Sequence, residues 1–169
     1  MAGNFVKISY RSVNIAYYFS RGDAGADGQM ITIILGVVLA RLSYIDIRTF
    51  RLPDAYTLPL IVAGLVLNTV WSGAIPFEHV AAASAGYLIF ALIGSAFFWW
   101  RGIDGLGLGD AKLLAAAGAW IGLRGLPVVV LVAAIGGIVA ALLTASDRNT
   151  RIAFGPWLAL GFFVVWVAR

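Results

Sequence analysis

Two aspartates, Asp46 and Asp110, stand at the edges of long apolar stretches. Asp46 closes the first stretch, and Asp110 follows Gly107-Leu108-Gly109 directly before another. An ionisable side chain at such a boundary is costly, so it is by default a candidate functional group. Two carboxyl groups from different helices could meet in the fold and share one proton, an arrangement that lets water attack an amide.

A short polar turn links Asp46 to Asp54. Pro53 biases the residue before it toward an extended backbone, so we expect this turn to separate two helices. Asp54 stands where the N-cap of the second helix belongs, and we favour this structural role for it. Asp46 instead ends a helix, where the macrodipole disfavours an anion. The alternative for Asp46 is an interfacial charge paired with Arg48 or Arg51.

Asp110 also has a structural alternative, because it precedes a helix and could be its N-cap. Glycine recurs before it at Gly105, Gly107 and Gly109. Such a segment disfavours helix and opens positive-φ geometry. We therefore expect a backbone that approaches another chain closely and pairs its free N–H and C=O groups with an extended substrate. Lys112 could help hold the negative charge of the site or extend to the membrane interface, and the second role is favoured.

The composition predicts a membrane protein. The chain has 169 residues, of which 62% are hydrophobic and 12% charged, too few polar groups to cover a soluble globule. Its basic residues are scattered singly beside apolar runs, which is typical of membrane orientation and argues against nucleic acid as a partner. There is no cysteine and a single histidine, His79. This excludes thiolate zinc sites, a cysteine nucleophile and a His-based metal site, so we expect carboxylate chemistry without a metal or cofactor.

Six apolar runs predict an all-α fold, a polytopic membrane helix bundle of about six transmembrane helices. The runs are approximately 30–45, 56–71, 80–100, 111–123, 126–145 and 152–168. The fourth is short and rich in Ala and Gly, so we expect a tilted or packed span sheltered from lipid. The pair Gly118 and Gly122 favours close helix packing. We divide the chain into an N-terminal tail, 1–29, and a membrane-embedded domain, 30–169.

The basic residues of the short connections predict the orientation. One set of connections holds Arg48, Arg51, Arg101, Arg148 and Arg151, with Lys112 at the mouth of the fourth run. The opposite set holds only Arg124. By the positive-inside rule the first set is cytoplasmic, so Asp46 and Asp110 face the cytoplasm and the N-terminus lies outside. Three basic residues of the tail then fall outside, against the rule.

Three segments resemble a known family. The sequence GLGD at residues 107–110 matches the GxGD signature of intramembrane aspartyl proteases. The longer stretch 107–122 is similar to the type IV prepilin peptidases, as are residues 46–60, which include LPD, and FGPWLA at residues 154–159. The three motifs occur in the family's order, and the resemblance extends from about residue 30 to the C-terminus.

The resemblance implies a peptidase of the bacterial inner membrane. It would cut the basic leader from type IV prepilin or pseudopilin precursors after a glycine, before their hydrophobic helix, on the cytoplasmic face. The implied catalytic pair is Asp46 and Asp110, one ionised as general base and the other protonated, titrating as a unit. The implied substrate-binding residues are Gly107, Gly109, Asp54 and Lys112, with Asp54 in a supporting role at most.

One departure and several alternatives remain. Bifunctional family members carry an N-terminal region with a four-cysteine zinc site and N-methyltransferase activity. Because this chain has no cysteine and a short tail, the resemblance predicts a form with peptidase activity alone. The alternatives are a preflagellin or presenilin-like GxGD protease, or a non-enzymatic transporter subunit that relays protons through carboxylates. The position of both aspartates at run ends argues against a relay, and the identity of the precursor stays open.

Overall fold

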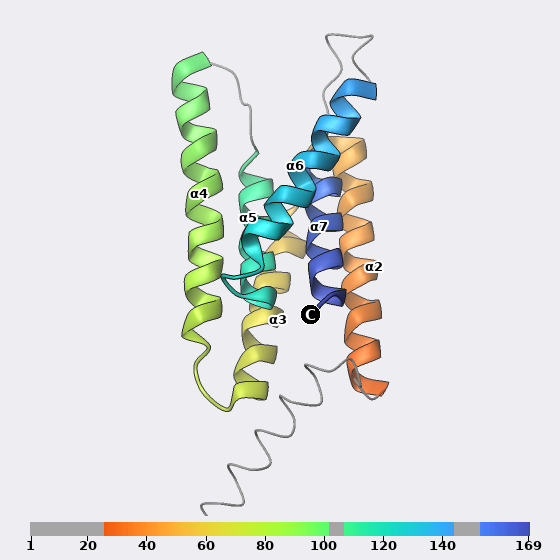
Figure 1. Cartoon of the computed structure of the whole chain (residues 1–169), viewed down its shortest axis with the longest axis vertical. Helices are drawn as coiled ribbons and strands as arrows, with labels where there is room; N and C mark the ends of the chain where they lie inside the picture. Colours follow the sequence, from red (N-terminus) through yellow and green to blue (C-terminus); the bar gives the residue numbers. More distant parts are fainter. Residues whose placement is uncertain (1–25, 102–106, 144–152) are drawn as a thin grey trace, which may run out of the picture.

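A computed structural model describes residues 26–101, 107–143 and 153–169, and within them the regular elements are all α-helices (Figure 1). The helices are α2 (Ala26–Thr49), α3 (Asp54–Ser72), α4 (Phe77–Arg101), α5 (Leu108–Ile121), α6 (Leu126–Leu143) and α7 (Gly155–Val167). The predicted all-α bundle is confirmed. The predicted tail, residues 1–29, lies mostly outside the described residues, and α2 begins at Ala26. The division into a tail and a membrane-embedded domain stays a prediction.

Four of these helices, α2, α3, α4 and α6, are long and apolar enough to cross a membrane. A bilayer core requires about 20 helical residues. By contrast, α5 has 14 residues and α7 has 13. At 1.5 Å per residue each of these two is ~20 Å long, shorter than the ~30 Å hydrocarbon core. The chain is thus a multi-pass membrane protein in which long helices accompany two short ones.

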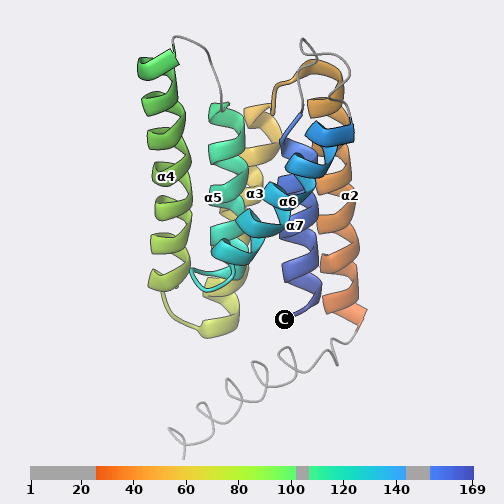
Figure 2. The same cartoon turned by 45° about the horizontal axis from the view of Figure 1, so that its top comes forward.

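The short helix α5 lies at the centre of the bundle. It packs against α3, α4, α6 and α7, and it lies between α4 and α7 in both views (Figures 1 and 2). Ala111 and every residue from Leu113 to Ile121 are buried. The prediction that the fourth apolar run is sheltered from lipid is therefore confirmed. A helix with small side chains suits this place because its neighbours can approach its backbone closely.

Glycine permits the closest of these approaches. A Cβ on Gly118 would lie 2.5 Å from the carbonyl oxygen of Ala82, and one on Gly86 would lie 3.0 Å from that of Leu114. The backbones of α4 and α5 thus come nearer than alanine at these positions would allow. The partner glycine of the predicted pair, Gly122, has another role. It ends α5 with a φ of 78°, a value that glycine adopts without strain.

Candidate active site

Asp46 lies in the last turn of α2, where its side chain is buried with 5% of its surface exposed. Its Oδ2 accepts a hydrogen bond of 3.0 Å from the backbone N–H of Gly155, the first residue of α7. The C-terminal end of α2 disfavours a carboxylate, whereas the N-terminal end of α7 favours one. The start of α7 thus offsets the unfavourable interaction between the Asp46 carboxylate and the C-terminal end of α2.

The alternative role for Asp46, pairing with a neighbouring arginine, is not what the structure has. The guanidinium of Arg48 lies 5.5 Å from the ring centroid of Tyr44. Within the described ranges Asp46 forms no ion pair. The ion pair found there joins Lys112 to Asp54. Asp46 therefore points into the bundle as a buried acid.

Asp110 lies in the first turn of α5, partly exposed. The N-cap of this helix is Gly107, so the N-cap alternative for Asp110 is wrong. As the third helical residue, Asp110 has its carboxyl group close to the backbone N–H of Gly107, where the return contact of a capping arrangement lies. Its carboxyl group is also close enough to Asp46 to feel the charge of that side chain. Two acids from α2 and α5 thus lie within electrostatic range of each other at one end of the bundle.

The glycines before Asp110 act differently from the prediction. Gly107 has a φ of −73° and a ψ of 142°, an ordinary extended backbone, and Gly109 lies within α5. The expected positive-φ geometry is therefore wrong for both, while Gly105 lies outside the described residues. Gly109 instead permits a close contact, because a Cβ there would lie 2.8 Å from the Cβ of Leu52. The turn after α2 rests directly on the start of α5.

Asp54 and Lys112 form an ion pair between α3 and α5. The N-cap of α3 is Pro53, so the N-cap role predicted for Asp54 is wrong, because that residue begins the helix. Its Oδ1 lies 2.5 Å from Nζ of Lys112, a side chain two residues beyond Asp110. Lys112 thus neutralises Asp54, and its extension to the membrane interface stays a prediction. The pair ties the first turn of α3 to the helix that carries Asp110.

Comparison with known proteins identifies the family of this site. Residues 33–142 match the type IV leader peptidase family, and this range includes both Asp46 and Asp110. The chain belongs to the type IV leader peptidase family. No solved structure matches the chain.

Three of its relatives in this family are bacterial proteins named prepilin leader peptidase/N-methyltransferase. The protein of Pectobacterium carotovorum subsp. carotovorum is 45% identical over 133 residues, which cover 76% of this chain and 48% of that protein. That of Aeromonas salmonicida is 41% identical over 142 residues, 81% of this chain and 48% of that protein. That of Escherichia coli (strain K12) is 44% identical over 126 residues, 73% of this chain and 56% of that protein. The chain spans about half the length of these relatives.

Gly155 contacts Asp46 in the site, but the sequence had not predicted it as a site residue. Its signal was the sequence FGP at residues 154–156, which we used only as a mark of resemblance. The Phe154 ring lies 6.3 Å from that of Phe90 on α4, and a Cβ on Gly137 of α6 would lie 3.4 Å from it. The start of α7 is thus located by α4 and α6 while it contacts Asp46 on α2.

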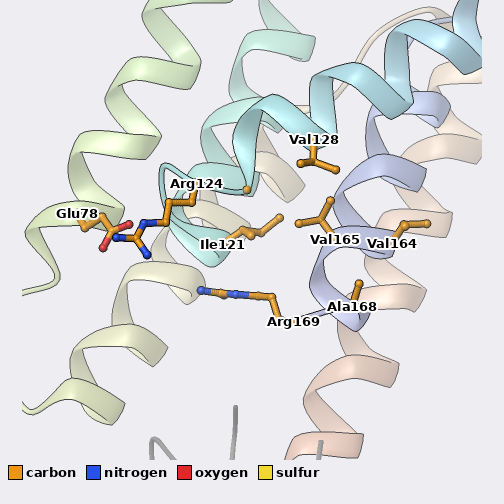
Figure 3. Close-up of a pocket in the computed structure, with 9 residues that line it drawn as sticks. Glu78, Ile121, Arg124, Val128, Val164, Val165, Ala168 and Arg169 are labelled. Carbon is orange, nitrogen blue, oxygen red and sulfur yellow. The ribbon is translucent and has the colours of Figure 1, made fainter. Parts of the chain in front are cut away.

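A cavity of about 620 Å³ lies at the other end of α5 and α7 (Figure 3). Ile121 and Val165 form part of its apolar wall, and Arg124 and Arg169 bring positive charge. Arg169 donates a hydrogen bond of 2.7 Å from Nη1 to the carbonyl oxygen of Trp120. Since Asp46 and Asp110 lie where α5 and α7 begin, this cavity is separate from the candidate active site.

The part of the chain that the structure describes contains no group of three or more His, Cys, Asp or Glu residues that could hold a metal ion. The chemistry available from the described side chains at this site is that of two carboxyl groups. When one proton is shared between such groups, the ionised one can take a proton from water while the protonated one polarises a carbonyl.

Proposed function

We propose that this protein is a membrane aspartyl endopeptidase that removes the N-terminal leader of type IV prepilin-like precursors. The observation that carries the proposal is that Asp46 of α2 and Asp110 of α5 lie close enough to interact electrostatically. Relatives at 41–45% identity are named prepilin leader peptidases, and the match to their family includes both aspartates. We assign the catalytic roles to these two residues.

In the proposed reaction, one aspartate is ionised and the other protonated when the precursor binds. The ionised carboxylate accepts a proton from a water molecule, which attacks the carbonyl carbon of the scissile peptide bond. The protonated carboxyl group donates a hydrogen bond to the carbonyl oxygen as negative charge develops there. A proton then passes to the leaving amine, the bond breaks, and the pair returns to its singly protonated state.

The start of α5 is where we place the contacts to the precursor. The N–H groups of Leu108 and Gly109 lie in the first turn of a helix, where they have no intrahelical partner and can donate to an extended chain. Gly107 is exposed beside them. Asp54 keeps 57% of its side chain exposed despite its pair with Lys112, and it is the carboxylate we propose to attract the basic leader.

We propose that this end of the bundle faces the cytoplasm and that cleavage occurs there, after a glycine and before the hydrophobic helix of the precursor. The charge distribution supports this orientation. Arg48 and Arg51 lie beside the aspartates, whereas Arg124 lies beyond the opposite end of α5. Basic residues of short connections favour the cytoplasmic side of the inner membrane. Arg148 and Arg151, which belong to the same argument, lie outside the described residues.

The test is to co-express the protein with a prepilin and to follow leader removal by mass spectrometry. Asp46→Asn and Asp110→Asn should each abolish cleavage while the protein still inserts, because each keeps the size of the side chain and removes its ionisable group. Glu78→Gln is the matched control, since this acid lies at the cavity at the opposite end, and it should cleave like the wild type. Substantial cleavage by either aspartate variant would refute the two-aspartate mechanism. An uncut prepilin with the wild-type protein would instead favour the proton-relay alternative.

A further inference from the structure

The first turn of α7 is built around the carboxyl group of Asp46. The backbone N–H of Gly155 donates to Oδ2 of Asp46 at 3.0 Å, across 109 positions of the chain and in a buried environment. Over the described residues Oδ1 accepts no hydrogen bond. One oxygen of this carboxyl group is therefore held by α7, and the other is left for the shared proton or for water.

The contact requires glycine for a steric reason. A Cβ at position 155 would lie 2.6 Å from Oδ2 and 3.0 Å from Cγ of Asp46, and real Cβ atoms essentially never come within 3.0 Å of another heavy atom. Alanine at this position would therefore push the carboxyl group away from α7. The side chain would then lose its hydrogen-bond donor and move from its present position near Asp110.

The start of α7 cannot move aside easily, because two large rings flank Gly155. Phe154 contacts the Phe90 ring on α4. Trp157 packs on Gly136 of α6, where even a methyl group would collide with its indole. Because densely packed interiors transmit such strain, an added methyl group at position 155 should displace the aspartate side chain and leave the helix in place.

We propose that Gly155 is a positioning residue for Asp46. Its N–H fixes one carboxyl oxygen, and its missing side chain leaves the space that the carboxyl group occupies. The catalytic consequence of this role rests on the proposed function, whereas the contact between Gly155 and Asp46 does not.

The kinetic test compares two glycine-to-alanine variants on the same helix. Gly155→Ala should lower kcat for leader removal by about 100-fold, the loss that follows when a reacting group is misplaced by about 1 Å. KM should stay within about twofold, since Gly155 holds an acid and does not bind the precursor. Gly161→Ala is the control on the same helix away from the aspartates, because its Cβ would lie 2.6 Å from the carbonyl oxygen of Val129, a backbone atom that yields less easily than a side chain. It should cost at least as much stability as Gly155→Ala, and its kcat should fall far less.

A second test needs no substrate and uses melting temperatures of the purified protein in detergent. Gly155→Ala should lower the melting temperature in the wild-type background and lower it much less in an Asp46→Ala background, where the obstructing Cγ and Oδ2 are gone. Gly161→Ala should lower it equally in both. If Gly155→Ala alone fails to fold, folding of the double variant with Asp46→Ala is the expected rescue.

The two tests separate the possible failures. Equal losses of melting temperature for Gly155→Ala in both backgrounds would overturn the positioning contact, and so would an unchanged kcat or a kcat no lower than that of Gly161→Ala. A wild-type protein that cleaves no prepilin would overturn the proposed function, together with the catalytic consequence of Gly155. The melting temperatures would then still decide whether Gly155 positions Asp46.

Discussion

At the scale of single residues, the atoms packed against each glycine of the site decide whether it can tolerate a side chain. Gly109 faces Leu52 at a distance that excludes a methyl group, whereas a Cβ on Gly107 would meet Oδ2 of Asp110 at an ordinary 3.7 Å. The two glycines of the GLGD sequence therefore differ in their tolerance of substitution, although they look equivalent in the sequence.

We predict that Gly109→Ala destabilises the protein by about 1–3 kcal/mol, the usual cost of an added methylene in a packed place. Gly107→Ala should change stability little, because its backbone has a φ of −73° that any residue can adopt. Thermal unfolding of both variants in detergent checks this difference. Equal destabilisation would show that the turn at Leu52 can move away from α5.

The ion pair between Asp54 and Lys112 should contribute little to stability. Asp54 is 57% exposed, so solvent screens the attraction, and such pairs are typically worth less than about 1 kcal/mol. We predict that Lys112→Gln shifts the melting temperature only slightly, and that the charge exchange Asp54→Lys with Lys112→Asp behaves similarly. A large loss for Lys112→Gln that the exchange restores would show a pair much stronger than its exposure implies.

At the scale of the elements, the close contact of α4 with α5 holds the helix that carries Asp110. A Cβ on Gly118 would meet the backbone of Ala82, and a backbone cannot rotate away as a side chain can. Gly118→Ala should therefore separate these helices and destabilise the protein by at least about 1–3 kcal/mol.

Gly137→Ala is the control for this prediction, because its added methyl group would lie 3.4 Å from the Phe154 ring, within van der Waals reach. Its melting temperature should fall clearly less than that of Gly118→Ala. Equal melting temperatures for the two variants would show that close backbone packing does not hold α5.

At the scale of the whole molecule, the aspartates and the charged cavity lie at opposite ends of the bundle. The turn after α2 and the starts of α3, α5 and α7 gather at one end, while the cavity lined by Arg124 and Arg169 lies at the other (Figures 1 and 3). The orientation of the membrane protein therefore decides which compartment each end contacts.

Engineered cysteines can determine this orientation because the chain has none of its own. Thr49 and Ser72 are both exposed and end α2 and α3, so they mark the two ends of the bundle. We predict that an impermeant thiol reagent applied to intact cells labels Ser72→Cys, and that it labels Thr49→Cys only after the membrane is opened. The reverse pattern would place Asp46 and Asp110 on the outer side.

The sequence by itself determined the helical class, the membrane location and the pair of aspartates. These properties follow from local chemistry: apolar runs of helical length must avoid water, and Asp46 and Asp110 are costly at their edges. The three ordered motifs added the family. Catalysis by the two residues remains a prediction.

Only the tertiary structure decided which groups surround those aspartates. Pattern and spacing describe a residue's neighbours along the chain, whereas Asp46 receives its hydrogen bond from Gly155, and Lys112 pairs with Asp54. The N-cap role expected for Asp54 and the positive-φ backbone expected at Gly107 and Gly109 were wrong for the same reason. A cap or a turn can be predicted from local sequence, but the close approach of Leu52 to Gly109 depends on how two distant segments pack.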